Sequence, residues 1–277
     1  MTLVMGVLNV TPDSFSDGGR WFDHGRAVAH GAAMISQGAD IIDVGGESTR
    51  PGAEPVDESE ERRRILPVIA ALASRVRVSV DTRKPEVAVA AVDAGATMIN
   101  DVSASLWPVA AEAGVAWIAM HMRGEPATMQ VAPAYRDVVA EVRDFLLFRA
   151  QAAEAAGVGE VWIDPGIGFG KTMEHNLRLL RHLDELVATG RPVAVGISRK
   201  SFIGRLAAAP AAAPAGPATP ATDDRPPVAA IDERLPGSLA AAIWAASRGA
   251  GMVRVHDVAE TVQAMRLLRL ATEAAAA

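Results

Sequence analysis

Short apolar runs alternate with longer segments of helical periodicity along the chain, and this alternation constrains the fold more than any other feature. Eight strand-like runs are predicted: Leu3–Asn9, Asp40–Val44, Arg77–Asp81, Met98–Asp101, Ala116–His121, Val161–Asp164, Val193–Ser198 and Gly251–Val255. Strands that alternate with helices form parallel sheets. Eight units predict an α/β fold, a (β/α)8 TIM barrel in which helices surround eight parallel strands. An open doubly wound sheet is the alternative, but such sheets rarely contain eight regular units.

The helical segments are predicted over Asp23–Gln37, Ser59–Ser74, Tyr135–Ala156, the stretch from the sixth strand to about Thr189, and Leu235–Ser247. Thr82 is expected to cap the helix that follows the third strand. Lys84 is expected in the first turn of that helix, with no special role.

Half of the 277 residues are hydrophobic but only 4% are aromatic, so the core must consist mainly of Val, Ile, Leu, Ala and Met. A single domain, residues 1–277, accommodates the eight units. The segment 207–227 interrupts them, since it is almost entirely Ala, Pro, Gly and Thr and its prolines prevent a continuous helix. It is predicted to be a disordered surface insertion, with a docking arm as the alternative.

The net charge is −6 and no basic run is present, so nucleic acid and anionic membranes are not expected as partners. The chain has no cysteine, which excludes disulfides and thiolate metal sites. No apolar run has the length of a membrane span, and no secretory signal pattern follows Met1. A cytoplasmic location is therefore expected.

Polar residues end or follow most of the predicted strands. In a barrel the carboxyl ends of all strands meet at one mouth, where catalysis takes place. The residues expected at this mouth are Asn9, Asp43, Asp81, Asn100, Asp101, His121, Asp164, Ser198, Lys200, Arg254 and His256.

One group at the mouth combines Asp81, Asn100 and Asp164 with the ammonium of Lys200. Buried carboxylates and amides require hydrogen-bond partners, and here they are expected to face the lumen. The set suits a flat heterocycle whose N–H groups donate to Asp and whose carbonyl accepts from Lys. The alternative is an internal Asp164–Lys200 salt bridge with a local turn at Asn100.

A second group suits anions. Arg254 and His256 are two residues apart, so their side chains point the same way, and arginine matches phosphate oxygens, as Arg50 also could. Asn9 and Asp17 offer the oxygen ligands that Mg²⁺ takes beside substrate phosphates. Ser201 begins a helix, where backbone N–H groups bind a second anion. These residues indicate a two-substrate enzyme that handles a phosphate or pyrophosphate.

Long motifs then resemble the dihydropteroate synthase family. The first two are Met5-Gly-Val-Leu-Asn-Val-Thr-Pro-Asp-Ser-Phe-Ser-Asp-Gly-Gly19 and Asp43-Val-Gly-Gly-Glu-Ser-Thr-Arg-Pro-Gly52. Shorter blocks follow in the family's order: Ser79–Thr82, Ile99–Asp101, Met120–Gly124, Asp164–Lys171, Ser198–Ser201 and Val253–Asp257. The resemblance covers essentially the whole chain except the insertion at 207–227.

The resemblance implies that 4-aminobenzoate displaces pyrophosphate from (7,8-dihydropterin-6-yl)methyl diphosphate, with Mg²⁺ assisting, in folate biosynthesis. It also implies a homodimer and a target of sulfonamides. The implied roles divide as follows: Asp81, Asn100, Asp164 and Lys200 bind the pterin; Asn9, Thr49, Arg50, Arg254 and His256 bind the diphosphate; Asn9 and Asp17 bind Mg²⁺; Phe15, Pro51, Phe169 and Ser201 bind the aminobenzoate. Asp81, Lys200, Arg254 and His256 are the implied catalytic residues.

Three other functions are considered. A catalytically inactive pterin-binding paralogue would show damaged loop motifs, and these are intact. A methyltetrahydrofolate-binding methyltransferase barrel need not contain Arg254, His256 or the two long motifs. A phosphosugar isomerase would need a catalytic Glu or Lys pair, which the sequence does not provide.

Two segments depart from the family's pattern or suggest movement. After Ile99–Ser103 the family has a glycine-rich loop, whereas this chain has the shorter Ala104-Ser-Leu-Trp-Pro108. Asn9 is expected to be fixed at the end of its strand. Pro12–Gly19 is expected to close over the substrates and bring Phe15 and Asp17 to the site.

Overall fold

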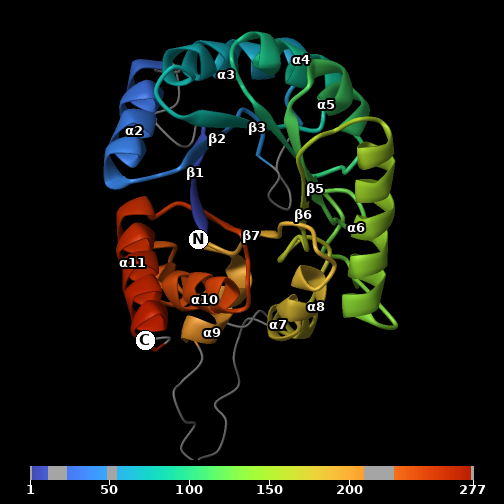
Figure 1. Ribbon diagram of the computed structural model, residues 1–277, viewed down its shortest axis with the longest axis vertical. Coiled ribbons are helices and arrows are strands. Elements are labelled where there is room, and N and C mark those ends of the chain that lie inside the picture. The colour runs from blue at the N-terminus through green and yellow to red at the C-terminus, as the bar shows by residue number, and fades with distance from the viewer. Residues whose placement is uncertain (1, 12–23, 49–54, 209–227, 276–277) are drawn as a thin grey trace, which may run out of the picture.

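The computed structural model describes residues 2–11, 24–48, 55–208 and 228–275 (Figure 1). Eight strands lie within these ranges: β1 Leu3–Asn9, β2 Ile41–Gly45, β3 Arg77–Asp81, β4 Met98–Asp101, β5 Ala116–Met120, β6 Val161–Asp164, β7 Ala194–Gly196 and β8 Met252–Val255. The helices are α2 His24–Gln37, α3 Glu58–Leu72, α4 Pro85–Asp93, α5 Trp107–Ala113, α6 Val138–Ala155, α7 Met173–Arg181, α8 Leu183–Val187, α9 Ser201–Ala208, α10 Leu235–Ser247 and α11 Val258–Ala275, with a short 3-10 helix η1 at Asp232–Arg234.

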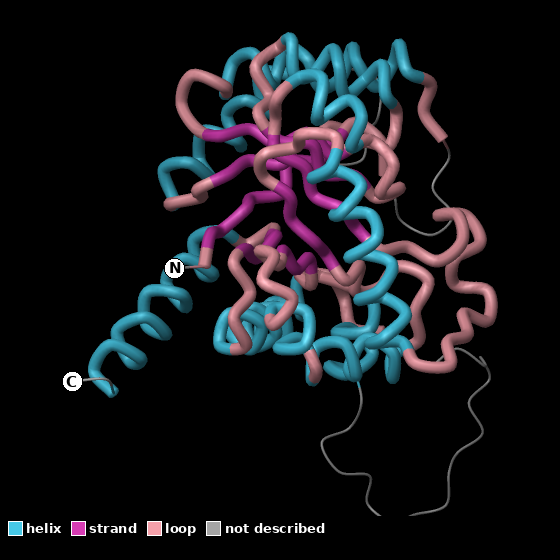
Figure 2. The backbone as a smooth tube through the Cα atoms, turned by 45° about the vertical axis from the view of Figure 1, so that its right-hand side comes forward, coloured by secondary structure: helices cyan, strands magenta, loops and turns pink. Residues whose placement is uncertain are grey.

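All neighbouring strands are parallel, in the order β6-β5-β4-β3-β2-β1-β8-β7. A single bridge between Ile163 and Val193 brings β7 back to β6, with the Ile163 amide donating to the Pro192 carbonyl at 3.0 Å. Figures 1 and 2 show the strands enclosed by helices. The predicted TIM barrel is therefore confirmed.

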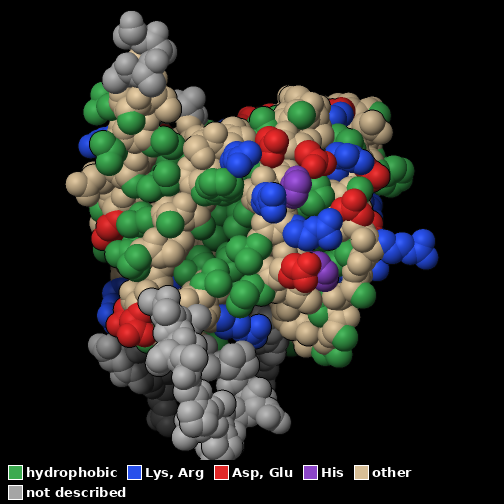
Figure 3. Space-filling model, turned by 90° about the horizontal axis from the view of Figure 1, so that it is seen from below, with side chains coloured by type: hydrophobic (Ala, Val, Ile, Leu, Met, Phe, Trp, Pro, Cys, Tyr) green, Lys and Arg blue, Asp and Glu red, His purple; other side chains and the backbone are tan. Residues whose placement is uncertain are grey.

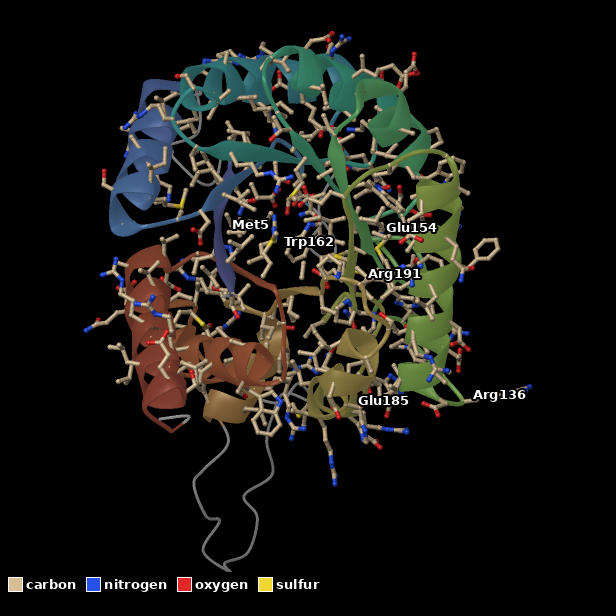
Figure 4. The ribbon with its side chains drawn as sticks, in the orientation of Figure 1. Met5, Arg136, Glu154, Trp162, Glu185 and Arg191 are labelled. Atoms are coloured by element: carbon tan, nitrogen blue, oxygen red, sulfur yellow. The ribbon has the colours of Figure 1, made fainter. Side chains whose placement is uncertain are left out.

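The barrel has an apolar floor and a separate apolar shell. Met5, Ile41, Met98, Trp162 and Met252 form the main part of the cluster inside the barrel. Figure 4 shows Met5 and Trp162 among the side chains within the ring of strands. A larger cluster, mostly Val, Ile, Leu and Ala, fills the space between strands and helices. Both faces of every strand are buried, which explains their nearly continuous apolar sequence.

The alternation of side chains along each strand places polar residues above the apolar floor. Asp43 follows Ile41 by two residues, Asn100 follows Met98, and Arg254 follows Met252. Their side chains therefore point into the lumen, one layer closer to the mouth.

Several predicted boundaries were wrong by a few residues, and one predicted cap was wrong. The helix predicted to reach Thr189 is divided into α7 and α8, because His182 leaves the helical conformation with φ −105° and ψ 30°. β7 ends at Gly196 rather than at Ser198. Lys84, and not Thr82, is the N-cap of α4, since Pro85 occupies the first helical position.

The predicted insertion at 207–227 begins inside a helix, because Ala207 and Ala208 belong to α9. The remainder, 209–227, lies outside the described residues, so its predicted disorder stays a prediction. Among the helices described, none combines the length and apolar character that crossing a membrane requires.

Candidate active site

Asp43 joins two of the lumen residues through a single oxygen. Its Oδ2 accepts from Nδ2 of Asn100 at 2.9 Å and from Nε of Arg254 at 2.5 Å, and the side chain is fully buried. Its Oδ1 has no hydrogen-bond partner among the described residues, nor has Oγ of Ser79, the residue paired with it on β3. Buried polar atoms of this kind require a water molecule or a ligand.

Arg254 continues this network to Asp81. Its Nη2 donates to Oδ2 of Asp81 at 2.6 Å. Burial raises the pKa of Asp81 to about 7, with Arg254 opposing the rise and Asp43 adding to it. Burial disfavours the charge of Arg254, but Asp43 and Asp81 outweigh burial and raise its pKa. The guanidinium therefore stays charged between two carboxylates.

Asp164, Phe169 and Lys200 lie around the loop that follows β6. Oδ1 of Asp164 accepts from the Gly166 amide at 2.7 Å, and burial raises the pKa of Asp164. The Lys200 ammonium donates to the Ile167 carbonyl and lies 4.3 Å from the centroid of the Phe169 ring. Burial lowers the pKa of Lys200 to about 7.

The salt bridge considered as an alternative for Asp164 and Lys200 is absent from the ion pairs of the described residues. Asn100 is held by Asp43 rather than by a local turn. Neither of the two alternatives is therefore present in the structure.

His256 and Ser201 lie nearer the mouth. Oγ of Ser198 is 3.1 Å from Nδ1 of His256 and accepts from the His256 amide at 3.2 Å. Ser201 is the exposed first residue of α9. The chain turns into this helix at Arg199, whose φ of 60° is unusual for a residue other than glycine. The Arg199 amide donates to Ser238 and its side chain pairs with Asp257, which together hold the turn.

Asn100 lies on β4, although the loop that follows departs from the family's pattern. Asp101 is fully buried and accepts from the amides of Ser103, Ser105 and Leu106 and from Nε1 of Trp117. This carboxylate therefore organises the loop.

Five of the predicted site residues lie outside the described residues: Phe15, Asp17, Thr49, Arg50 and Pro51. The predicted closure of Pro12–Gly19 falls there too. Asn9, the other expected metal ligand, ends β1 and is partly exposed. The described residues contain no group of three or more His, Asp or Glu side chains placed to bind a metal ion.

Sequence reasoning missed the roles of two residues. Asp43 was expected at the mouth, but its bonds to Asn100 and Arg254 depend on side-chain directions across the barrel. The prediction that Lys84 has no special role was wrong. Its ammonium donates to the Val56 carbonyl at 2.5 Å and pairs with Glu47 and, at 2.6 Å, with Glu61, which is 1% exposed. It ties the loop after β2 to α3.

The lumen thus brings together carboxylate and amide groups, one ammonium and one charged guanidinium. This arrangement suits a planar ligand that has several N–H donors and a carbonyl acceptor. His256 and the start of α9 lie at the rim, where they suit the anionic ends of ligands.

The chain is similar to known proteins over most of its length. A family model described as pterin binding enzyme matches residues 5–256. The dihydropteroate synthase of Mycobacterium leprae is 49% identical over 274 residues, which cover 96% of this chain and 92% of that protein.

Solved structures resemble the whole barrel. The dihydropteroate synthase of Xanthomonas albilineans with 4-aminobenzoic acid has a TM-score of 0.85 and 46% identity, covering 98% of this chain and 93% of that one. The same enzyme in complex with 7,8-dihydropteroate has a TM-score of 0.82 and 43% identity, covering 98% of this chain and 94% of that one. The Yersinia pestis dihydropteroate synthase in complex with a sulfonamide drug has a TM-score of 0.85 and 42% identity, covering 98% of this chain and 94% of that one.

Proposed function

The chain belongs to the dihydropteroate synthase family of pterin-binding enzymes, and we propose which of its residues bind each part of the substrates. The function is a step of folate biosynthesis: 4-aminobenzoate displaces diphosphate from (7,8-dihydropterin-6-yl)methyl diphosphate and gives 7,8-dihydropteroate. The similarity to a sulfonamide complex makes the protein a sulfonamide target as well.

The pterin is assigned to the lumen. Asp81, Asn100 and Asp164 accept from or donate to the edge of the ring, while Lys200 donates to its carbonyl. The network through Asp43 supports this assignment, because it fixes Asn100 and Arg254 before any ligand enters. A fixed set of polar groups loses little free energy to reorganisation when it binds.

The diphosphate is assigned to the rim, with Asn9, Thr49, Arg50, Arg254 and His256. Arg254 connects the positions assigned to the pterin and to the diphosphate, the two parts of one substrate, since its guanidinium is already bonded to Asp81. Positive charge there stabilises the diphosphate as the C–O bond breaks.

The aminobenzoate is assigned to Phe15, Pro51, Phe169 and Ser201. The exposed N-terminus of α9 supports a carboxylate at Ser201, and the Phe169 ring lies beside Lys200 at the edge of the pterin site. The amine would then lie next to the carbon that loses diphosphate.

In the proposed mechanism the C–O bond to diphosphate breaks first. The carboxylate of Asp81 and the ring nitrogens spread the positive charge left on the pterin. The aromatic amine then attacks this carbon, forms the C–N bond and loses a proton to solvent. No covalent enzyme intermediate is needed, so the protein contributes positioning and charge.

Mg²⁺ is proposed at Asn9 and Asp17. The carboxamide of Asn9 fits such a site, because it is a neutral oxygen ligand at the mouth and accepts no hydrogen bond within the described residues. Bound there, the ion would neutralise charge on the departing diphosphate. Removal of divalent ions with EDTA is expected to stop diphosphate release, and added Mg²⁺ to restore it. Unchanged release in EDTA would contradict the proposal.

Homodimerisation is proposed on the face that includes α7 and α10. Leu177 on α7 and Trp244 on α10 are both more than 40% exposed, and Trp244 is bonded to the carbonyl of Leu180. Figure 3 shows hydrophobic side chains gathered in a hollow on this side of the molecule. Size-exclusion chromatography with light scattering tests the proposal, and a monomer at assay concentration would contradict it.

A cytoplasmic location remains a prediction, to be tested by cell fractionation.

The observation that carries the assignment is the convergence of Asp81, Asn100, Asp164 and Lys200 on one lumen. The decisive experiment mixes the purified protein with both substrates and Mg²⁺ and measures 7,8-dihydropteroate. Absence of product would favour the inactive paralogue, and pterin binding without product would identify it.

A further inference from the structure

We propose that Lys171 is a positioning residue that fixes the loop after β6, Pro165–Lys171, against the end of β5, so that Phe169 and Lys200 hold their places in the site. This inference rests on the proposed roles of Phe169 and Lys200. It gives a role to a lysine that neither substrate is expected to touch.

Lys171 is almost completely enclosed, with 2% of its surface exposed. Its Nζ lies 3.0 Å from the carbonyl oxygens of Gly166 and Phe169 and 2.9 Å from Nδ1 of His121. The two carbonyls can only accept, so at least two N–H bonds of Lys171 point into the loop. The other two contacts reach His121, the residue that follows β5: its Nδ1, and its backbone carbonyl oxygen at 3.3 Å.

The backbone of the loop packs closely against the chain that follows β5. A Cβ atom at Gly166 would lie 1.8 Å from the carbonyl oxygen of His121, and one at Gly170 would lie 2.2 Å from that of Arg123. Both glycines have positive φ angles, 63° and 61°. Such an approach tolerates no side chain, which makes the position of the loop sensitive to any loss of its anchor.

Lys200 also contacts this loop. It donates to the Ile167 carbonyl and lies over the Phe169 ring. Two lysines therefore bind different carbonyls of the loop: Lys171, at the end of the loop, and Lys200. When a ligand carbonyl attracts the Lys200 ammonium, the bond to Ile167 weakens, and the contacts of Lys171 remain to hold the loop.

The charges around Lys171 fit this role. Burial and the nearby Lys171 lower the pKa of His121 to about 3, so its ring is neutral and Nδ1 can accept. Burial and the charge of Lys200 lower the pKa of Lys171, while Asp164 raises it. A charged Lys171 has three N–H groups, enough for both loop carbonyls and for Nδ1 of His121. A neutral Lys171 has only two, so the complete set of contacts requires the ammonium form.

The test begins with Lys171→Met, which keeps the length of the side chain and removes its N–H groups. The KM for 4-aminobenzoate is expected to rise about tenfold while kcat falls less, because the variant loses positioning of a binding wall. Hydrogen exchange in the peptide that spans 165–171 should become faster without ligand, with the strands unchanged.

A second pair of variants keeps the proposal testable if Lys171→Met does not fold. His121→Asn retains an acceptor near Nδ1 and should preserve KM, whereas His121→Leu removes it and should raise KM. Gln130→Ala is the matched control, since the exposed Gln130 also donates to this loop, at the Gly168 carbonyl, 2.6 Å away. Its KM should stay within about twofold of the wild type.

A folded Lys171→Met protein with wild-type KM values, or equal effects of His121→Asn and His121→Leu, would overturn the proposal. Failure of the proposed function would look different, because the wild-type protein itself would then form no dihydropteroate. Hydrogen exchange in the peptide 165–171 needs no substrate, so it tests whether Lys171 holds the loop even if the protein forms no dihydropteroate.

Discussion

The guanidinium of Arg254 on β8 and the carboxylate of Asp81 on β3 meet in the lumen, with Nη2 and Oδ2 2.6 Å apart. Two strands separate them in the sheet, and on one of these Asp43 accepts from Nε of the same arginine. Burial raises the pKa of Asp81, and this one cation both opposes that rise and lies next to the proposed diphosphate position. The pterin and diphosphate sites are therefore electrostatically coupled.

This coupling predicts a narrow pH optimum. The pKa of Asp81 is raised to about 7, so Asp81 loses its charge below that pH. The pKa of Lys200 is lowered to about 7, so Lys200 loses its charge above that pH. The free enzyme has both charges only near neutrality. A plot of kcat/KM for the pterin diphosphate against pH should be bell-shaped with a maximum near pH 7.

A variant next to Asp81 tests whether Asp81 causes the acid limb of this profile. Asp43→Asn removes a charge that raises the pKa of Asp81, so the acid limb should move to lower pH. Glu125→Gln is the control, since Glu125 is 75% exposed and pairs with Arg83 outside this network. An acid limb that does not move in Asp43→Asn would assign it to another group.

Lys200→Ala is expected to weaken binding of the pterin diphosphate by roughly tenfold to a hundredfold, the effect of losing one buried, charge-assisted hydrogen bond. Isothermal titration measures this directly. Arg205→Ala, an exposed basic residue on the same helix α9, is the matched control. Near-normal affinity in Lys200→Ala would mean that Lys200 only supports the Ile167 carbonyl.

The sequence predicted the barrel and its lumen because both follow from local periodicity. Alternation along each strand is enough to place Asn100 and Arg254 on the inner face. It does not predict which inner side chains bond to each other, so the partners of Asp43 could not be predicted without the structure. Lys84 was misjudged for a similar reason, since Glu47 and Glu61 approach it from two other elements. The predicted roles of Phe15, Asp17, Thr49, Arg50 and Pro51 remain predictions.

Lys84→Met should strongly destabilise the fold. It would leave Glu61, which is 1% exposed, and Glu47, which is 10% exposed, without their shared cation. Removing one partner of a buried ion pair costs about 3 kcal/mol of the free energy of unfolding. Urea unfolding followed by circular dichroism measures the change.

The control for Lys84 is the ion pair between Arg191 and Glu154, 2.8 Å apart and labelled in Figure 4. The Glu154 side chain is 42% exposed, so Arg191→Met should cost no more than about 1 kcal/mol. Equal losses in the two variants would show that the Lys84 cluster is no more important than a surface pair.

Gly166→Ala should prevent the loop after β6 from forming, through backbone strain and through a clash of the added Cβ atom. Gly114→Ala separates these two causes. The two glycines have nearly the same φ, 63° and 64°, so the backbone strain of an alanine, about 1 kcal/mol, is common to both. At Gly114 an added Cβ meets nothing within 4 Å, whereas at Gly166 it would lie 1.8 Å from the His121 carbonyl oxygen. Gly114→Ala should therefore retain full synthase activity with a slightly lower melting temperature. Gly166→Ala should lose most activity, because the loop must move away from β5 and carry Phe169 with it. Similar activities in the two variants would show that the close approach at Gly166 is not needed for function.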